Sequence, residues 1–227
     1  MNRKKIVGIV HRTRLVLRSL LFVAILVIYL QGIKVPGFLK LAVWACFVSA
    51  ILGRSYALKH ESNGSQKHLE VNYIPTGRPY VKTTKDRDVL MVALVWIGFN
   101  LIFGILHLTG TIDKGVMLLL GAAYAVCDEV CILFFCPFQQ WFLHNQCCTT
   151  CRIYNWDFAM MCTPLLFVPG FYTWSLTALS LALLLQWELA AHRHPERFEK
   201  STNDYLSCSQ CADKLCAHKK QIKKQRI

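Results

Sequence analysis

The sequence predicts an all-α polytopic membrane protein with four to six membrane-spanning helices. Of its 227 residues, 54% are hydrophobic, and they gather in long runs instead of alternating with polar residues. The formal net charge is +13, and the charged residues lie mainly between these runs. A basic soluble protein would suggest nucleic acid, but here the apolar runs point to a lipid bilayer, so no nucleic-acid partner is expected.

Five apolar runs can be marked along the chain. They are Leu15–Ile33, Phe38–Gly53, Val89–Gly110, Gly115–Phe135 and Phe158–Leu189. The first follows a basic start without a small-x-small cleavage site, so we expect a retained signal anchor. A span needs about 20 apolar residues, and the last run is too long for one helix and short for two. We therefore predict a short helical hairpin or re-entrant pair there, with Pro169-Gly170 near its tip.

The lysines and arginines fall almost entirely on one side of this predicted bundle. Six lie in residues 1–18, seven in 54–88, nine in 192–227 and one, Arg152, in 137–157; the other side has Lys34, Lys40 and Lys114. The positive-inside rule then places the N-terminus, the loops 54–88 and 137–157 and the C-terminus on the cytoplasmic side of a cell membrane. Six crossings, or four plus a re-entrant pair, satisfy this bias. The basic segments are expected to contact anionic lipid.

The sequence divides into a transmembrane domain, 1–191, and a basic cysteine-rich cytoplasmic tail, 192–227. The domain carries two cytoplasmic loops, 54–88 and 137–157. In the first loop, LEVNYI is followed by PTGR and PYVK. This pattern predicts a small β-hairpin within a solvated connector.

Nine of the eleven cysteines form three groups. The groups are Cys127, Cys131 and Cys136; Cys147, Cys148 and Cys151; and Cys208, Cys211 and Cys216. Cys46 and Cys162 stand alone in apolar runs, where free cysteine packs as a small hydrophobe. The predicted topology places all three groups on or toward the cytoplasmic face. Because the cytoplasm is reducing, we expect metal binding or redox chemistry there, not disulfides.

The tail motif SCSQCADKLCAHKK has the spacing C-x2-C-x4-C-x-H. Cys208, Cys211, Cys216 and His218 could complete a tetrahedral Cys3His zinc site. The three cysteines could instead hold an iron–sulfur cluster with a ligand from elsewhere. The alternative is free thiols in a flexible tail.

The loop motif CCTTC contains a second C-x2-C, Cys148 to Cys151, with Cys147 adjacent. Three thiolates this close repel one another, and a bound cation would relieve the repulsion. Arg152 is expected to lower the thiol pKa values or to donate hydrogen bonds to sulfur. Cys136 is a further candidate ligand, and the alternative is a loop with incidental cysteines.

The motif CDEVC places two carboxylates deep in an apolar run. Cys127 and Cys131 are four residues apart and share one helix face. Asp128 and Glu129 lie between them, and charges inside a membrane usually face the bundle interior or a polar cavity. They could form a proton relay, join a metal ligand set, or pair with Asn100, His107 or Arg152. The alternative is a protonated pair that serves only helix packing.

Two segments of the sequence resemble known families. The turn Cys136-Pro137-Phe138 after a cysteine-bearing span resembles polytopic membrane ferredoxins of the nitrous-oxide and nitrate reductase accessory type, which implies cytoplasmic iron–sulfur sites. Their C-x2-C-x2-C-x3-C-P run is absent here, so their two-cluster arrangement does not carry over. CCTTCRIYNWDFAMM and the tail resemble cysteine-rich multi-pass membrane proteins of bacteria, which brings no activity with it.

The sequence favours a membrane-anchored metal centre, iron–sulfur or zinc, that could take part in electron transfer with a redox partner. One alternative is metal-ion or proton-coupled transport through Cys127, Asp128, Glu129 and Cys131. Others are an assembly protein with a zinc-pinned tail and a thiol oxidoreductase. There is no nucleophile elbow, Walker loop, metalloprotease helix or dinucleotide fingerprint, so no enzyme class is predicted.

Overall fold

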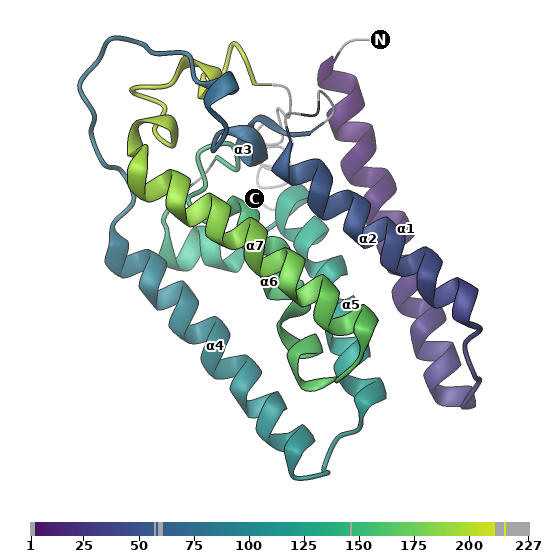
Figure 1. Ribbon diagram of the computed structural model, residues 1–227. Helices are drawn as coiled ribbons and strands as arrows, with labels where there is room; N and C mark the ends of the chain where they lie inside the picture. Colours follow the sequence, from purple (N-terminus) through teal and green to yellow (C-terminus); the bar gives the residue numbers. More distant parts are fainter. Residues whose placement is uncertain (1–2, 57, 59–60, 146, 212–215, 217–227) are drawn as a thin grey trace, which may run out of the picture.

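The computed structural model describes residues 3–56, 58, 61–145, 147–211 and 216. Its long helices are α1 (Arg3–Gln31), α2 (Gly37–Ser55), α4 (Asp86–Leu108), α5 (Lys114–Leu133) and α7 (Phe171–Arg193), seen together in Figure 1. Within the described residues, these five helices are long and apolar enough to cross a membrane. They coincide with the predicted apolar runs, so the all-α polytopic fold is confirmed.

The last apolar run forms an unequal hairpin. Its first arm is α6 (Asp157–Cys162), continued by the 3-10 helix η4 (Thr163–Phe167), and its second arm is α7. The first arm is much shorter than the stretch of about 20 residues that a span needs. As predicted, Pro169 and Gly170 lie at the tip. As a result, α1 begins and α7 ends at the same end of the bundle (Figure 1).

The polar parts of the chain gather at this same end, which we call the capped end. It comprises the described residues of 56–85, 134–156 and 194–211. Its short helices are α3 (Asn63–Gln66), η1 (Glu70–Asn72), the π-helix η2 (Phe138–Phe142), η3 (Tyr154–Trp156), η5 (Pro195–Arg197) and η6 (Asp204–Leu206). At the opposite end, only short turns around residues 32–36, 109–113 and 168–170 join the helices.

The predicted β-hairpin in residues 54–88 is wrong. The described part of this loop contains no strand, and residues 73–85 run extended along the tail. The Thr76 N–H donates to the carbonyl of Thr202 at 3.1 Å, and the Asp204 N–H donates to the carbonyl of Ile74 at 2.8 Å. The backbone groups of Ile74 and Thr76 thus pair with residues 202–204 of the tail and not with a second strand.

The first half of the same loop is buried, which corrects the prediction of a solvated connector. The polar side chains from Glu61 to His68 are each at most 3% exposed. Ser62 caps α3 by accepting from the Ser65 N–H at 3.1 Å. The Asn63 amide donates to the carbonyl of Tyr205 at 2.9 Å, so the tail helps to cover this stretch.

Gly64 marks the closest approach of α3 to the CCTTC turn. A Cβ at this position would lie 3.1 Å from the Cys148 oxygen and 3.1 Å from the Thr149 Cα, and both atoms belong to backbone. We expect Gly64→Ala to destabilise the fold by about 1–3 kcal/mol through overpacking. The measurement is the thermal unfolding midpoint in detergent, followed by tryptophan fluorescence.

Gly98→Ala is the matched control, because a Cβ at Gly98 in α4 meets nothing within 4 Å. Alanine in a helix interior is favoured over glycine by about 0.5–1 kcal/mol, so this variant should be neutral or slightly stabilised. Equal midpoints for Gly64→Ala and Gly98→Ala would contradict the close approach.

Candidate functional site

A cavity of about 130 Å³ lies where α5, α6 and the loop between them meet, inside the capped end. Five cysteines line it, from two of the three sequence groups: Cys127, Cys131, Cys136, Cys148 and Cys151. The cavity is also lined by two methionines, Met160 and Met161, and by three polar side chains, Asp128, Gln139 and Asp157. The remaining lining residues are apolar or aromatic. We call this the thiol cavity.

Local structure explains how two distant motifs reach one cavity. Cys127 and Cys131 lie one turn apart on α5, as their spacing predicted, and both face the cavity. α5 ends at Leu133. In the following loop, the Cys151 N–H donates to the carbonyl of Cys148 at 3.0 Å and closes a tight turn. This turn directs both cysteines of the second C-x2-C at the end of α5.

Among the described residues, the cavity cysteines form no disulfide. The Cys148 sulfur lies 3.9 Å from the Gln139 amide. Burial raises the pKa of the Cys151 thiol to about 12, and the nearby Lys67 ammonium opposes part of that shift. This thiol is therefore protonated at neutral pH unless a cation displaces its proton.

The thiol cavity supplies several soft donors but no preformed polydentate site. Among the described residues, no three side chains of histidine, cysteine, aspartate or glutamate are grouped closely enough to hold a metal ion. A metal bound here with three or more ligands would require side chains to rotate toward it.

The tail cysteines do not join the thiol cavity. Cys208 is exposed, and Cys216 is half-buried. Cys211 is buried, and its sulfur lies 3.6 Å from the hydroxyl of Thr149. Thr149 is one of the two threonines that separate Cys148 and Cys151 in the sequence. His218 lies outside the described residues. The predicted Cys3His site therefore remains a prediction.

Two further predicted residues of the CCTTC loop have other partners. Cys147 does not line the cavity, and its N–H donates to the Asn145 side chain at 2.9 Å. The Arg152 guanidinium forms a bidentate pair with Glu188 at 2.8 and 2.5 Å. The Trp156 indole donates to the same carboxylate at 2.6 Å. Arg152 thus ties the loop to α7.

The two carboxylates on α5 are paired with α1. Arg18 lies 2.6 Å from Asp128 and 3.4 Å from Glu129, and His11 Nδ1 lies 2.9 Å from Glu129. Glu129 is fully buried, and Asp128 also lines the thiol cavity. The partners expected from sequence bond elsewhere: Asn100 to Tyr124, His107 to the carbonyl of Ile112, and Arg152 to Glu188.

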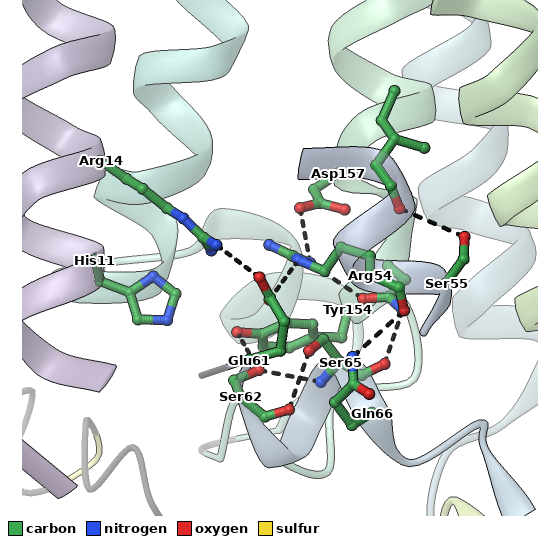
Figure 2. A network of polar contacts seen from close by, with 12 residues as sticks. His11, Arg14, Arg54, Ser55, Glu61, Ser62, Ser65, Gln66, Tyr154 and Asp157 are labelled. Atoms are coloured by element: carbon green, nitrogen blue, oxygen red, sulfur yellow. Dashed lines mark hydrogen bonds and ion pairs between the residues drawn. The ribbon is translucent and has the colours of Figure 1, made fainter. Parts of the chain in front are cut away.

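A second charged cluster is built around Arg54, near the end of α2. Figure 2 shows Arg54 between Glu61 and Asp157, at 3.1 and 3.0 Å, with Arg14 reaching Glu61 from α1 at 2.6 Å. Arg54 is 1% exposed, and it also donates to the Asn155 side chain at 3.1 Å. Because Asp157 lines the thiol cavity, this cluster fixes one of the cavity walls.

Lys67 is a buried amine directly behind the CCTTC turn. It is 0% exposed, and its ammonium donates to the carbonyls of Thr149 and Cys151 at 3.2 and 2.8 Å. The rings of Trp187 and Phe198 each lie 5.3 Å from its nitrogen. Burial lowers the pKa of Lys67 to about 7. Lys67 therefore holds the turn that presents Cys148 and Cys151.

Sequence reasoning missed three anchors of the cavity and its loop: the polar face of α1, Arg54 and Lys67. His11, Arg14 and Arg18 are spaced three and four residues apart, which places them on one face of α1. That periodicity is a sequence signal for a polar helix face, beyond the contribution of the arginines to topology. No local sequence pattern distinguishes Arg54 and Lys67 from the other lysines and arginines in 54–88.

Comparison with known proteins gives no further lead. No family model matches this chain, and no curated protein or solved structure matches it.

Proposed function

We propose that this chain is an integral membrane protein that holds a metal ion through the cysteines of the thiol cavity. The observation that carries the proposal is the convergence of the CDEVC and CCTTC motifs on one buried cavity. Three of the ligands expected from sequence, Cys136, Cys148 and Cys151, line it together. Cys127 and Cys131 add two more thiols on the adjacent helix.

The chemistry of the donors fits this proposal. Thiolates bind zinc, copper(I) and iron–sulfur clusters, and a bound cation displaces the thiol protons. An iron–sulfur cluster would supply electron transfer, whereas zinc would supply a structural link between α5 and the loop. The buried anchors Arg54 and Lys67 hold the loop and the start of α6 in place, as the supporting residues of a metal site do.

We also propose that the capped end lies on the cytoplasmic side of a cell membrane. The basic residues concentrate in the segments that form this end, and the three on the other side, Lys34, Lys40 and Lys114, lie at or near the opposite turns. The thiols would then lie in a reducing compartment and stay available to metal. The exposed basic side chains of 78–87 would contact anionic lipid.

The test is metal content and the ultraviolet–visible spectrum of anaerobically purified protein in detergent. We expect about one metal ion or cluster per chain, as single-site metal proteins show. It should be lost when Cys136, Cys148 and Cys151 are changed together to serine. Cys46→Ser is the control, because Cys46 lies exposed on α2 far along the chain from the cavity motifs. Protein that folds normally but binds no metal would reject the proposal.

One observation favours a second candidate, thiol redox chemistry. Cys131, in the last turn of α5, and Cys136, three residues beyond the end of that helix, both line the thiol cavity. A mild disulfide oxidant of the diamide class should then link them, with loss of two protons and two electrons. Transport through CDEVC remains an untested alternative, and the pairing of both carboxylates with α1 does not favour it.

A further inference from the structure

We infer that the start of α4 and the π-helix η2 together bind the headgroup of one phospholipid of the ethanolamine class. The lipid phosphate binds Arg87, and the lipid ammonium binds Asp88. This site is separate from the thiol cavity. It rests on the membrane-spanning position of α4 and does not depend on the metal centre.

The site is a hollow of about 410 Å³ on the surface of the capped end. Small-molecule sites in proteins typically enclose about 300–1,000 Å³. The first turns of α4 form one wall, and η2 with the residues after it forms the other. The lining residues are Arg87, Asp88, Met91, Trp141, Phe142 and His144. The ring of Trp96 on α4 lies 6.1 Å from that of Phe138 on η2, so the two walls are packed against each other below the hollow.

The hollow lies where α4 enters the membrane. The candidate span runs from Asp86 to Leu108, so the charged lining residues stand in its first turn. Trp141 is 66% exposed and Met91 is 44% exposed. Tryptophan concentrates at the level of the lipid headgroups, where one side of its ring meets apolar chains and the other meets water. A molecule that fills this hollow is therefore a neighbour of the headgroups, and lipid is the ligand at hand.

The charges in the hollow match a zwitterion in sign. The Arg87 side chain is 82% exposed, and its Nε lies 3.6 Å from the Asp88 carboxylate, which is too long for a hydrogen bond. The two opposite charges are thus adjacent, and each keeps capacity for a further partner. A guanidinium binds phosphate oxygens with two parallel hydrogen bonds, and a carboxylate accepts from a primary ammonium. A headgroup that is only anionic would place like charge against Asp88.

His144 supplies a further donor from the opposite wall. It is exposed, and its φ is 47°, the only positive φ of a non-glycine residue in the described part of the chain. Residues other than glycine adopt this conformation at a cost in energy, and they cluster at ligand sites. The N–H groups of Leu143 and Asn145 donate to the carbonyls of Phe138 and Gln139, each at 3.0 Å, and fix the backbone on both sides of it. Its imidazole can donate one hydrogen bond to a phosphate oxygen.

The test is native mass spectrometry of the full chain in detergent, titrated with phosphatidylethanolamine, phosphatidylcholine or phosphatidylglycerol of identical acyl chains. We expect a single tightly bound phosphatidylethanolamine. Phosphatidylcholine, whose ammonium has no N–H to donate, should bind about tenfold more weakly, as for the loss of one charge-assisted hydrogen bond. Arg87→Gln and Asp88→Asn should each lower the affinity for phosphatidylethanolamine by about the same factor. Arg78→Gln is the matched control, because Arg78 is exposed in the same loop and does not line the hollow.

The outcomes separate this inference from the proposed function. Tightest binding of phosphatidylglycerol, unaffected by Asp88→Asn, would overturn the choice of headgroup and leave the proposed contact of the capped end with anionic lipid in place. Equal affinities for phosphatidylethanolamine and phosphatidylcholine would overturn the ammonium contact. Equal losses in Arg87→Gln and Arg78→Gln would indicate a diffuse basic surface and overturn the site. None of these results bears on the metal centre, because the hollow and the thiol cavity share no lining residue.

Discussion

Replacing Arg54 by methionine is expected to destabilise the fold by about 3–5 kcal/mol, the usual cost of leaving buried charges without their partner. Arg54 is the shared partner of Glu61 and Asp157, whose side chains are 3% and 5% exposed. Its guanidinium also lies 5.6 and 5.4 Å from the rings of Tyr154 and Phe158. The variant should show a strongly lowered unfolding midpoint in detergent and a disordered thiol cavity.

The control for this prediction is Arg87→Met, because the Arg87 side chain is 82% exposed and its pairing with Asp88 at 3.6 Å is weak. Exposed ion pairs contribute about 0–1 kcal/mol, so its midpoint should stay near that of the parent. Adding Asp157→Asn to Arg54→Met should recover part of the loss, because the Asp157 side chain, which loses its ion pair with Arg54, is then neutral. Equal midpoints for Arg54→Met and Arg87→Met would contradict the role of Arg54.

The spans were predictable because their signal is local. Each long helix carries its own apolar run, and Pro169-Gly170 marks the tip of the last hairpin within the run itself. The shared face of Cys127 and Cys131 follows from helical spacing in the same way. A pattern of this kind depends on neighbours within a few residues, so one sequence is enough to identify it.

The capped end was not predictable because its partners are distant in sequence. The stretch Glu61–His68 has the composition of a solvated loop, and it is buried only because residues from α2, residues 149–157 and the tail surround it. The convergence of CDEVC and CCTTC has the same origin. The two motifs are close enough in sequence to meet, but their spacing alone does not show that they do. Their contact depends on how the loop 134–156 folds back over the end of α5.

Raising the pH from about 7 to about 10 is expected to stabilise the fold through Lys67. In the folded chain its pKa is lowered to about 7, against an ordinary value of 10.5, and the largest cause is burial. Between these values the unfolded chain holds a proton that the folded chain lacks, so the free energy of unfolding rises with pH, by at most about 1.4 kcal/mol per unit. Below pH 7 both states hold the proton, and this contribution becomes constant. The measurement is the unfolding midpoint in detergent from pH 6 to pH 10.

Lys67→Met should remove this rise, and the difference between parent and variant isolates Lys67 from the other groups that titrate in the window. The neighbouring His68, whose pKa is lowered to about 4, changes charge well below it. The variant also leaves the carbonyls of Thr149 and Cys151 without their donor, so it should be less stable than the parent at pH 9. Lys114→Met, at an exposed position beside the opposite turn, should keep the full pH dependence. If parent and Lys67→Met depend on pH equally, Lys67 is not the group that titrates, and the CCTTC turn is held by an amine that stays charged throughout.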